Sequence, residues 1–109
     1  MNEKQKRELA RMKKLVHEGK RKFIIRRDRN YLQDLLEIGI SEELAWNEIL
    51  LLSAYDYVPD YRPFFSKNGN DGLTFKKRIN DNLVYIKIKI EEYNKEDATV
   101  CLSFHIDHK

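Results

Sequence analysis

The hydrophobic pattern of this chain changes once along its length, and that change limits the folds it can adopt. Up to about residue 52, apolar residues recur three and four positions apart, which is the spacing of one helix face. From residue 73 they recur at every second position, which is the spacing of a half-buried strand. Helices followed by strands are typical of an α+β domain. We therefore predict N-terminal helices packed on one face of a C-terminal antiparallel sheet.

The first half of the chain predicts three helices, at residues 4–18, 31–38 and 41–52. Gly19 and Gly39 follow the first two helices as C-terminal stops, and Ser41 is a favourable N-cap for the third. Trp46 lies among the apolar residues of the third helix, which cover more than one stripe. We expect this helix to be largely buried and Trp46 to belong to the core.

The remaining segments predict strands and one long connection. Three strands joined by short loops are expected at residues 73–79, 83–90 and 99–105. The short run Phe23–Ile25, flanked by basic residues, is expected to form an edge strand. Two prolines and the turn-forming run Asn68–Gly72 make residues 56–72 a long irregular connection.

Length and composition exclude several classes of protein. A chain of 109 residues is expected to form one domain over residues 1–109. The longest apolar run, Ile49–Leu52, is too short to cross a membrane. The charged N-terminus lacks a secretory signal, so we expect a cytoplasmic protein. The single cysteine, Cys101, rules out an internal disulfide, and glycine-rich nucleotide motifs and zinc-protease motifs are absent.

Charge is segregated along the sequence. Residues 1–29 hold 12 Lys and Arg against four acidic residues, whereas residues 30–60 hold seven acidic residues and no Lys or Arg. This arrangement predicts a dipolar surface whose basic part attracts a phosphate or an acidic partner. For the first helix alone we favour the simpler interpretation, in which Lys and Arg only solvate an amphipathic face.

Alternation in the last two strands predicts which side chains share a face. Apolar residues occupy one parity in each strand, at positions 84, 86, 88 and 90 and at positions 100, 102 and 104. A symmetric loop around Lys95 places Ile86 opposite Phe104 and Ile88 opposite Leu102. The same pairing collects a polar set on the other face: Tyr85, Lys87, Lys89, Ser103 and His105, with Cys101 on the same side.

The preceding strand adds a cation beside Tyr85, and the length of the turn at residues 80–82 decides which one. A two-residue turn places Lys76 opposite Tyr85, a three-residue turn places Lys77 there, and a four-residue turn places Arg78 there. The apolar residues at 73, 75 and 79 favour Lys76 and Arg78 on the polar face.

A phenol, an imidazole and several ammonium groups on one face form a set that can bind a phosphodiester and move protons on it. The competing interpretation is a solvated outer face, since antiparallel sheets commonly leave one side in water. By pattern alone that ordinary interpretation is favoured. His17 and His108 are weaker candidates, and the three histidines show no metal-ligand spacing with carboxylates, so we expect no metal and no cofactor.

Three segments together resemble a known family. They are Met12–Gly19, the Ser53-Ala54-Tyr55-Asp56-Tyr57 segment, and the pair Leu83–Ile90 with Val100–His105. These are similar to the opening helix, the serine-x-x-aspartate segment and the closing hairpin of MqsR-type toxins, the motility quorum-sensing regulators of type II toxin–antitoxin systems. The hairpin is most similar to that of Gram-positive members.

The resemblance implies a RelE-like fold and a toxin that cleaves messenger RNA without metal and is neutralised by a cognate antitoxin. Tyr85 and Lys87 match the family's tyrosine and following lysine, and His105 stands where other members have a lysine. Two further family residues, a lysine and a glutamine, are replaced near Val58-Pro59 and Gly72-Leu73.

The leading hypothesis is therefore an endoribonuclease in which the ribose 2′-OH attacks the phosphate. The catalytic residues we expect are Tyr85, His105 and Lys77, and the RNA-binding residues are Lys76, Arg78, Lys87 and Lys89. Which of Tyr85 and His105 is the acid and which the base stays open. The alternatives are a non-catalytic RNA-binding or antitoxin-binding module and a structural interaction protein that uses the acidic helices. The oligomeric state is not predicted.

Overall fold

The computed structural model describes residues 1–25, 27–59 and 72–107. Within these ranges, three helices precede most of a five-stranded mixed sheet, which confirms the predicted α+β class. The elements follow one another as α1 (Glu3–His17), β1 (Arg21–Phe23), α2 (Tyr31–Ile38), α3 (Glu42–Leu50), the 3-10 turn η1 (Ala54–Asp56), β2 (Tyr57–Val58), β3 (Leu73–Ile79), β4 (Asn82–Tyr93) and β5 (Glu96–Ile106).

Local sequence explains where the helices begin and end. Asn2 caps α1 by accepting a hydrogen bond from the Gln5 N–H, and the Gln5 side chain accepts one from the Asn2 N–H. Ser41 caps α3 as predicted, its hydroxyl oxygen accepting from the Leu44 N–H at 3.1 Å. Gly39 ends α2 in the left-handed region at φ 86°, a conformation that costs glycine little.

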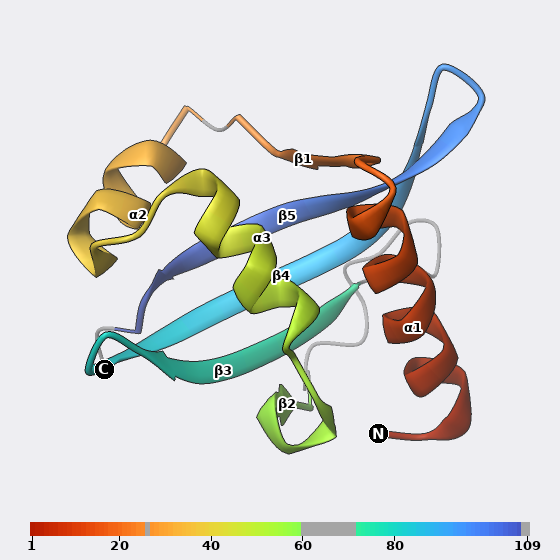
Figure 1. Ribbon diagram of the computed structural model, residues 1–109, viewed down its shortest axis with the longest axis horizontal. Helices are drawn as coiled ribbons and strands as arrows, with labels where there is room; N and C mark the ends of the chain where they lie inside the picture. Colours follow the sequence, from red (N-terminus) through yellow and green to blue (C-terminus); the bar gives the residue numbers. More distant parts are fainter. Residues whose placement is uncertain (26, 60–71, 108–109) are drawn as a thin grey trace.

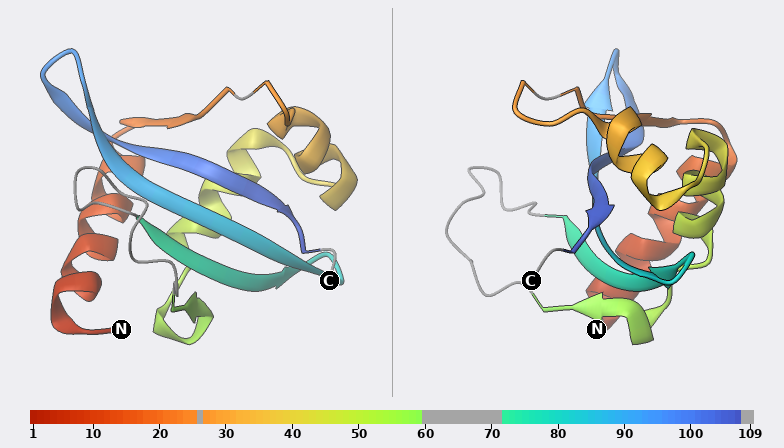
Figure 2. Two further views of the ribbon diagram at one scale, coloured as in Figure 1. Left: turned by 180° about the vertical axis from the view of Figure 1, so that it is seen from behind. Right: turned by 90° about the vertical axis from the view of Figure 1, so that its left-hand side faces the viewer.

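All three helices lie against the same face of the sheet. Figure 1 shows α3 crossing in front of the central strands, with α2 and α1 to either side. The edge-on view in Figure 2 places the helices together on one side of the strands. The core between the layers includes Met12, Trp46 and Ile49 from the helices and Ile86 and Ile88 from β4, all buried. The predicted core position of Trp46 is confirmed.

The strand order is β1-β5-β4-β3-β2. β3, β4 and β5 form the predicted antiparallel meander, but β1 pairs with β5 in parallel, so the purely antiparallel sheet that we predicted is wrong. A parallel pair needs a long crossover, and the whole chain between β1 and β5 supplies it. The edge strand covers Arg21–Phe23 rather than residues 23–25, and Ile25 is exposed.

Two other segments differ from their predicted extents. The connection at residues 56–72 contains the short strand β2, which pairs with Thr74 and Phe75 of β3, while residues 60–71 lie outside the described ranges. The third helix ends at Leu50 rather than Leu52 and is less buried than predicted, because Leu44 and Leu51 face outward.

No helix in the described part of the chain combines the length and the apolar composition needed to cross a bilayer.

A β-bulge in β5 changes the predicted face of several residues. Tyr85, Ile86 and Lys87 pair as predicted with residues 105, 104 and 103, but Ile88 pairs with Cys101, so Leu102 is an extra residue. Beyond the bulge the parity of β5 reverses. Leu102 is only partly buried, Cys101 faces the helix-covered core, and Val100 is buried outside that core.

The reversed parity also explains a buried hydroxyl. Thr99 is fully buried, and its Oγ1 donates to the Met12 carbonyl of α1 at 2.9 Å. A buried hydroxyl without a partner is costly, and this bond removes that cost while tying β5 to α1. The predicted placement of Cys101 on the polar face is therefore wrong, and so are the pairing of Ile88 with Leu102 and the core position of Leu102 under the helices.

The burial of Cys101 leads to a testable prediction about the reactivity of its thiol. Cys101 is almost fully inaccessible, and desolvation raises the pKa of its thiol well above the ordinary value, although the thiol also donates to the Ser103 carbonyl. The reactive thiolate is therefore scarce at pH 8, and we expect iodoacetamide to alkylate the native protein far more slowly than it alkylates the protein in urea. Alkylation of the native protein at the rate of a small free thiol would place Cys101 at the surface.

Candidate active site

The turn between β3 and β4 decides which cation lies beside Tyr85. Asn80 and Asp81 both have positive φ, 50° and 66°, as in a two-residue hairpin turn of type I′, and Asn and Asp tolerate this region better than most residues. Ile79 then pairs with Asn82, and Lys76 pairs with Tyr85. Of the three turn lengths considered, the two-residue turn is the one present.

This register separates Lys76 from Lys77. Lys76 shares the helix-free face with Tyr85, whereas Lys77 pairs with Val84 and faces the helices. The Lys77 ammonium forms an ion pair with Glu48 of α3 at 3.5 Å. Lys77, which we predicted as catalytic, therefore does not join Tyr85 and His105, and the lysine next to them is Lys76.

Tyr85 and His105 form a stacked pair on the helix-free face, near the end of β5. They are direct partners across β4 and β5, as predicted, and their ring centroids lie 5.3 Å apart at an interplanar angle of 22°. Both side chains are partly exposed. The other face of β4 and β5 is buried under the helices, which fixes the pairing of the two strands. This pairing holds a phenol and an imidazole within reach of one group on a bound molecule.

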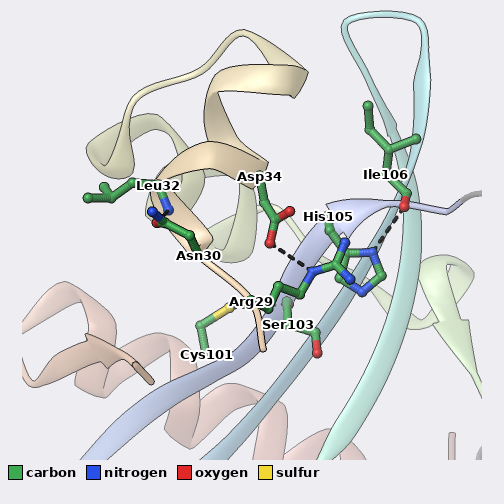
Figure 3. A network of polar contacts seen from close by, with 8 residues as sticks. All are labelled: Arg29, Asn30, Leu32, Asp34, Cys101, Ser103, His105 and Ile106. Atoms are coloured by element: carbon green, nitrogen blue, oxygen red, sulfur yellow. Dashed lines mark hydrogen bonds and ion pairs between the residues drawn. The ribbon is translucent and has the colours of Figure 1, made fainter. Parts of the chain in front are cut away.

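The backbone orients the histidine ring. Its Nδ1 lies 3.0 Å from the Ile106 carbonyl oxygen, drawn as a dashed line in Figure 3. A carbonyl oxygen only accepts, so Nδ1 carries the proton of this bond and the neutral ring keeps its lone pair on Nε2. The atom of His105 that can take or give a proton to a bound molecule is therefore Nε2.

Lys76 has a carboxylate partner that the sequence did not point to. Its ammonium lies 2.9 Å from Asp107 Oδ2, and both side chains are mostly buried. The Asp107 N–H donates to the Leu83 carbonyl at 2.8 Å, which fixes the end of β5 against β4. Thirty-one positions separate Lys76 from Asp107, so only the fold brings them together.

The other predicted RNA-binding residues divide into two groups. Lys87 pairs with Ser103, two residues along β4 from the pairing of Tyr85 with His105. Arg78 is exposed near the hairpin turn, and its Nη1 donates to the Asp81 carbonyl at 3.4 Å. Both lie on the same face as Tyr85.

Lys89 belongs to a separate cluster on that face, four residues or roughly 13 Å further along β4 than Tyr85. It forms an ion pair with Glu91, which accepts a hydrogen bond from the Tyr93 hydroxyl at 2.6 Å. Hydrogen bonds from Lys89 and then Tyr93 lower the pKa of Glu91. The ammonium of Lys22 lies 4.2 Å from the Tyr93 ring centroid. The fold therefore does not bring Lys89 to the Tyr85–His105 pair.

The remaining titratable candidates lie elsewhere. His17 is exposed in the last turn of α1, and His108 lies outside the described residues. No group of three or more His, Cys, Asp or Glu residues in the described ranges is arranged to hold a metal ion. The arrangement at Tyr85 and His105 consists instead of two proton-transfer groups with Lys76 and Lys87 around them.

The sequence matches no protein-family model, and no curated protein matches it significantly.

Proposed function

We propose that this protein is an endoribonuclease that cleaves single-stranded RNA without a metal ion, through attack of the ribose 2′-OH on the adjacent phosphate. The observation that supports the proposal best is the stacked pair of Tyr85 and His105, flanked by Lys76 and Lys87 on the helix-free face. Proton-transfer groups and cations on one surface are the requirements of this reaction.

The chemistry divides into one bond formed and one bond broken. The 2′-oxygen bonds to phosphorus as a base takes its proton, and the bond from phosphorus to the 5′-oxygen breaks as an acid gives that oxygen a proton. The products are a 2′,3′-cyclic phosphate and a 5′-hydroxyl. His105 acts through Nε2 and Tyr85 through its phenol, one as base and the other as acid. Lys76 and Lys87 stabilise the extra negative charge on the phosphate oxygens.

The wider assignment follows from the same residues. We propose that the chain is an MqsR-type toxin with a RelE-like version of the α+β fold, that it acts on messenger RNA in the cytoplasm, and that a cognate antitoxin neutralises it. The resemblance of the segments around Tyr57, Tyr85 and His105 to that family supports this, together with the order of helices and strands.

The direct test uses purified protein, single-stranded RNA and an excess of EDTA. We expect cleavage to continue in EDTA and to leave cyclic phosphate and 5′-hydroxyl ends, detected by end-specific labelling. RNA affinity should also fall steeply as salt rises, because phosphate contacts release counterions. Binding without cleavage would support the non-catalytic module in place of the enzyme, and a lack of affinity at low salt would contradict both.

The two neighbouring lysines provide a matched pair of variants. Lys76→Gln should lower cleavage by about tenfold, because it removes a cation that lies beside Tyr85 and offsets the negative charge of Asp107 at the site. Lys77→Gln should leave the cleavage rate close to that of the wild type, because Lys77 lies on the helix side. It should cost about 1–3 kcal/mol of folding free energy, because the mostly buried Glu48 carboxylate loses its ion pair. Single-turnover cleavage and urea unfolding measure the two effects. A larger loss of cleavage in the Lys77 variant would contradict the proposed face.

A further inference from the structure

Arg29 lies at the outer side of β5, next to the site described above but on no strand. It belongs to the segment between β1 and α2 and directly precedes Asn30, the N-cap of α2. Asn30 Oδ1 accepts a hydrogen bond from the Leu32 N–H at 3.0 Å, which fixes the path of this segment at the start of the helix. Figure 3 shows the Arg29 side chain extending from there toward β5, where Ser103 and His105 are drawn.

The guanidinium of Arg29 is held by one of its five N–H groups. Its Nε donates to Asp34 Oδ2 at 2.9 Å, and Asp34 is only 12% exposed, whereas Arg29 is 38% exposed. No other hydrogen bond or ion pair of Arg29 occurs within the described part of the chain. The carboxylate therefore sets the plane of the guanidinium while both Nη groups stay available to a ligand.

Arg29 and Ser103 line the same small cavity at the edge of β5, of about 10 Å³, which has room for about one water molecule. A ligand of any size therefore has to lie outside it, against the exposed side of the guanidinium. Ser103 pairs with Lys87 and is two residues from His105, a separation of roughly 7 Å along a strand. One nucleotide chain can span that separation and contact both places.

We propose that Arg29 binds a backbone phosphate of single-stranded RNA next to the phosphate held at Tyr85 and His105, which extends the site off the edge of β5. This inference rests on the proposed ribonuclease function. A guanidinium is suited to this task, because its planar fork donates two parallel hydrogen bonds to one phosphate. Asp34 acts as a positioning residue that keeps the fork facing outward.

The experiment measures binding of a 2′-O-methyl RNA of about ten nucleotides, long enough for one site, by fluorescence anisotropy at several salt concentrations. The methyl group blocks the attacking oxygen, so binding is measured without cleavage. Arg27 provides the matched control, because it lies two residues earlier, is exposed, and loses the same charge in Arg27→Gln.

Arg29→Gln should weaken binding about tenfold relative to Arg27→Gln and lower the slope of log affinity against log salt by about 0.7. Arg29→Lys should keep the slope and recover part of the affinity, because it restores the charge but not the fork. Asp34→Asn should leave the slope of log affinity against log salt unchanged and should weaken RNA binding by less than Arg29→Gln does. The double variant Arg29→Gln with Asp34→Asn leaves no unpaired carboxylate, and its melting temperature shows whether the fold is retained.

Equal losses in Arg29→Gln and Arg27→Gln would overturn the role of Arg29 while leaving the proposed ribonuclease intact. Loss of affinity with an unchanged salt slope would also overturn it, because a phosphate contact has to contribute to that slope. A wild-type protein that binds no RNA at low salt would overturn both this inference and the proposed function.

Discussion

Replacing His105 by alanine should lower the rate of RNA cleavage by roughly 10²–10⁴-fold, which is the usual effect of removing a positioned proton-transfer group. The fold should survive, since His105 is partly exposed on the helix-free face and the core side of β5 is unchanged. His17→Ala is the matched control, because His17 is exposed at the end of α1. Single-turnover cleavage under identical conditions compares the two variants.

Tyr85→Phe should produce a loss of the same order while removing only one hydroxyl. Tyr55→Phe removes the same group from a fully exposed tyrosine and should leave the rate unchanged. If both Tyr85 and His105 variants cleave at the wild-type rate, the stacked pair has no catalytic role and the face is only solvated.

The second large effect concerns stability. Gly72 has φ 78° immediately before β3, and a Cβ there would overlap the Ile88 carbonyl oxygen and lie 2.9 Å from Lys89 Cβ. Gly72→Ala should therefore lower the free energy of unfolding by about 2–5 kcal/mol, from left-handed strain and overpacking together. Urea unfolding measures this change.

Gly19 isolates the steric part of that effect. Its φ is 80°, nearly the same as that of Gly72, but a Cβ at Gly19 meets no atom within 4 Å. Gly19→Ala should therefore cost only about 1–2 kcal/mol, the strain of a left-handed residue. Equal destabilisation of the two variants would show that Gly72 is not in close contact with β4.

Strict alternation explains why part of the site could be predicted from the sequence. Residues 84–88 alternate without exception, and the other face of β4 is buried, so a shift by one residue would expose every apolar side chain. The faces of Tyr85 and Lys87 follow from this pattern, but their partners on β5 do not. The symmetric loop that we predicted around Lys95 is wrong, because the turn consists of Asn94 and Lys95, and the extra residue Leu102 offsets that difference so that Tyr85 still pairs with His105. Alternation does not assign faces at Val100-Cys101-Leu102, because three consecutive apolar residues fit either face. The bulge at Leu102 could therefore not be predicted from the sequence.

The lysine next to Tyr85 could not be chosen from the pattern alone. The run Asn80-Asp81-Asn82 contains three good turn residues, and a difference of one residue exchanges Lys76 for Lys77. The apolar residues of β3 favoured Lys76, and the two-residue turn in the fold agrees with them. The same parity places Lys77, which we predicted as catalytic, on the helix side of β3.

The sequence by itself determined the cap at Ser41, the stop at Gly39, the order of the three helices and the last three strands, and the polar face of β4, because these depend on residues close together in the chain. Tertiary structure decided the parallel pairing of β1, the bulge at Leu102, the pairing of Lys76 with Asp107 and the approach of Arg29 to Ser103. Each of these joins segments far apart in sequence. Their energies depend on how whole layers pack together, and no local periodicity records that.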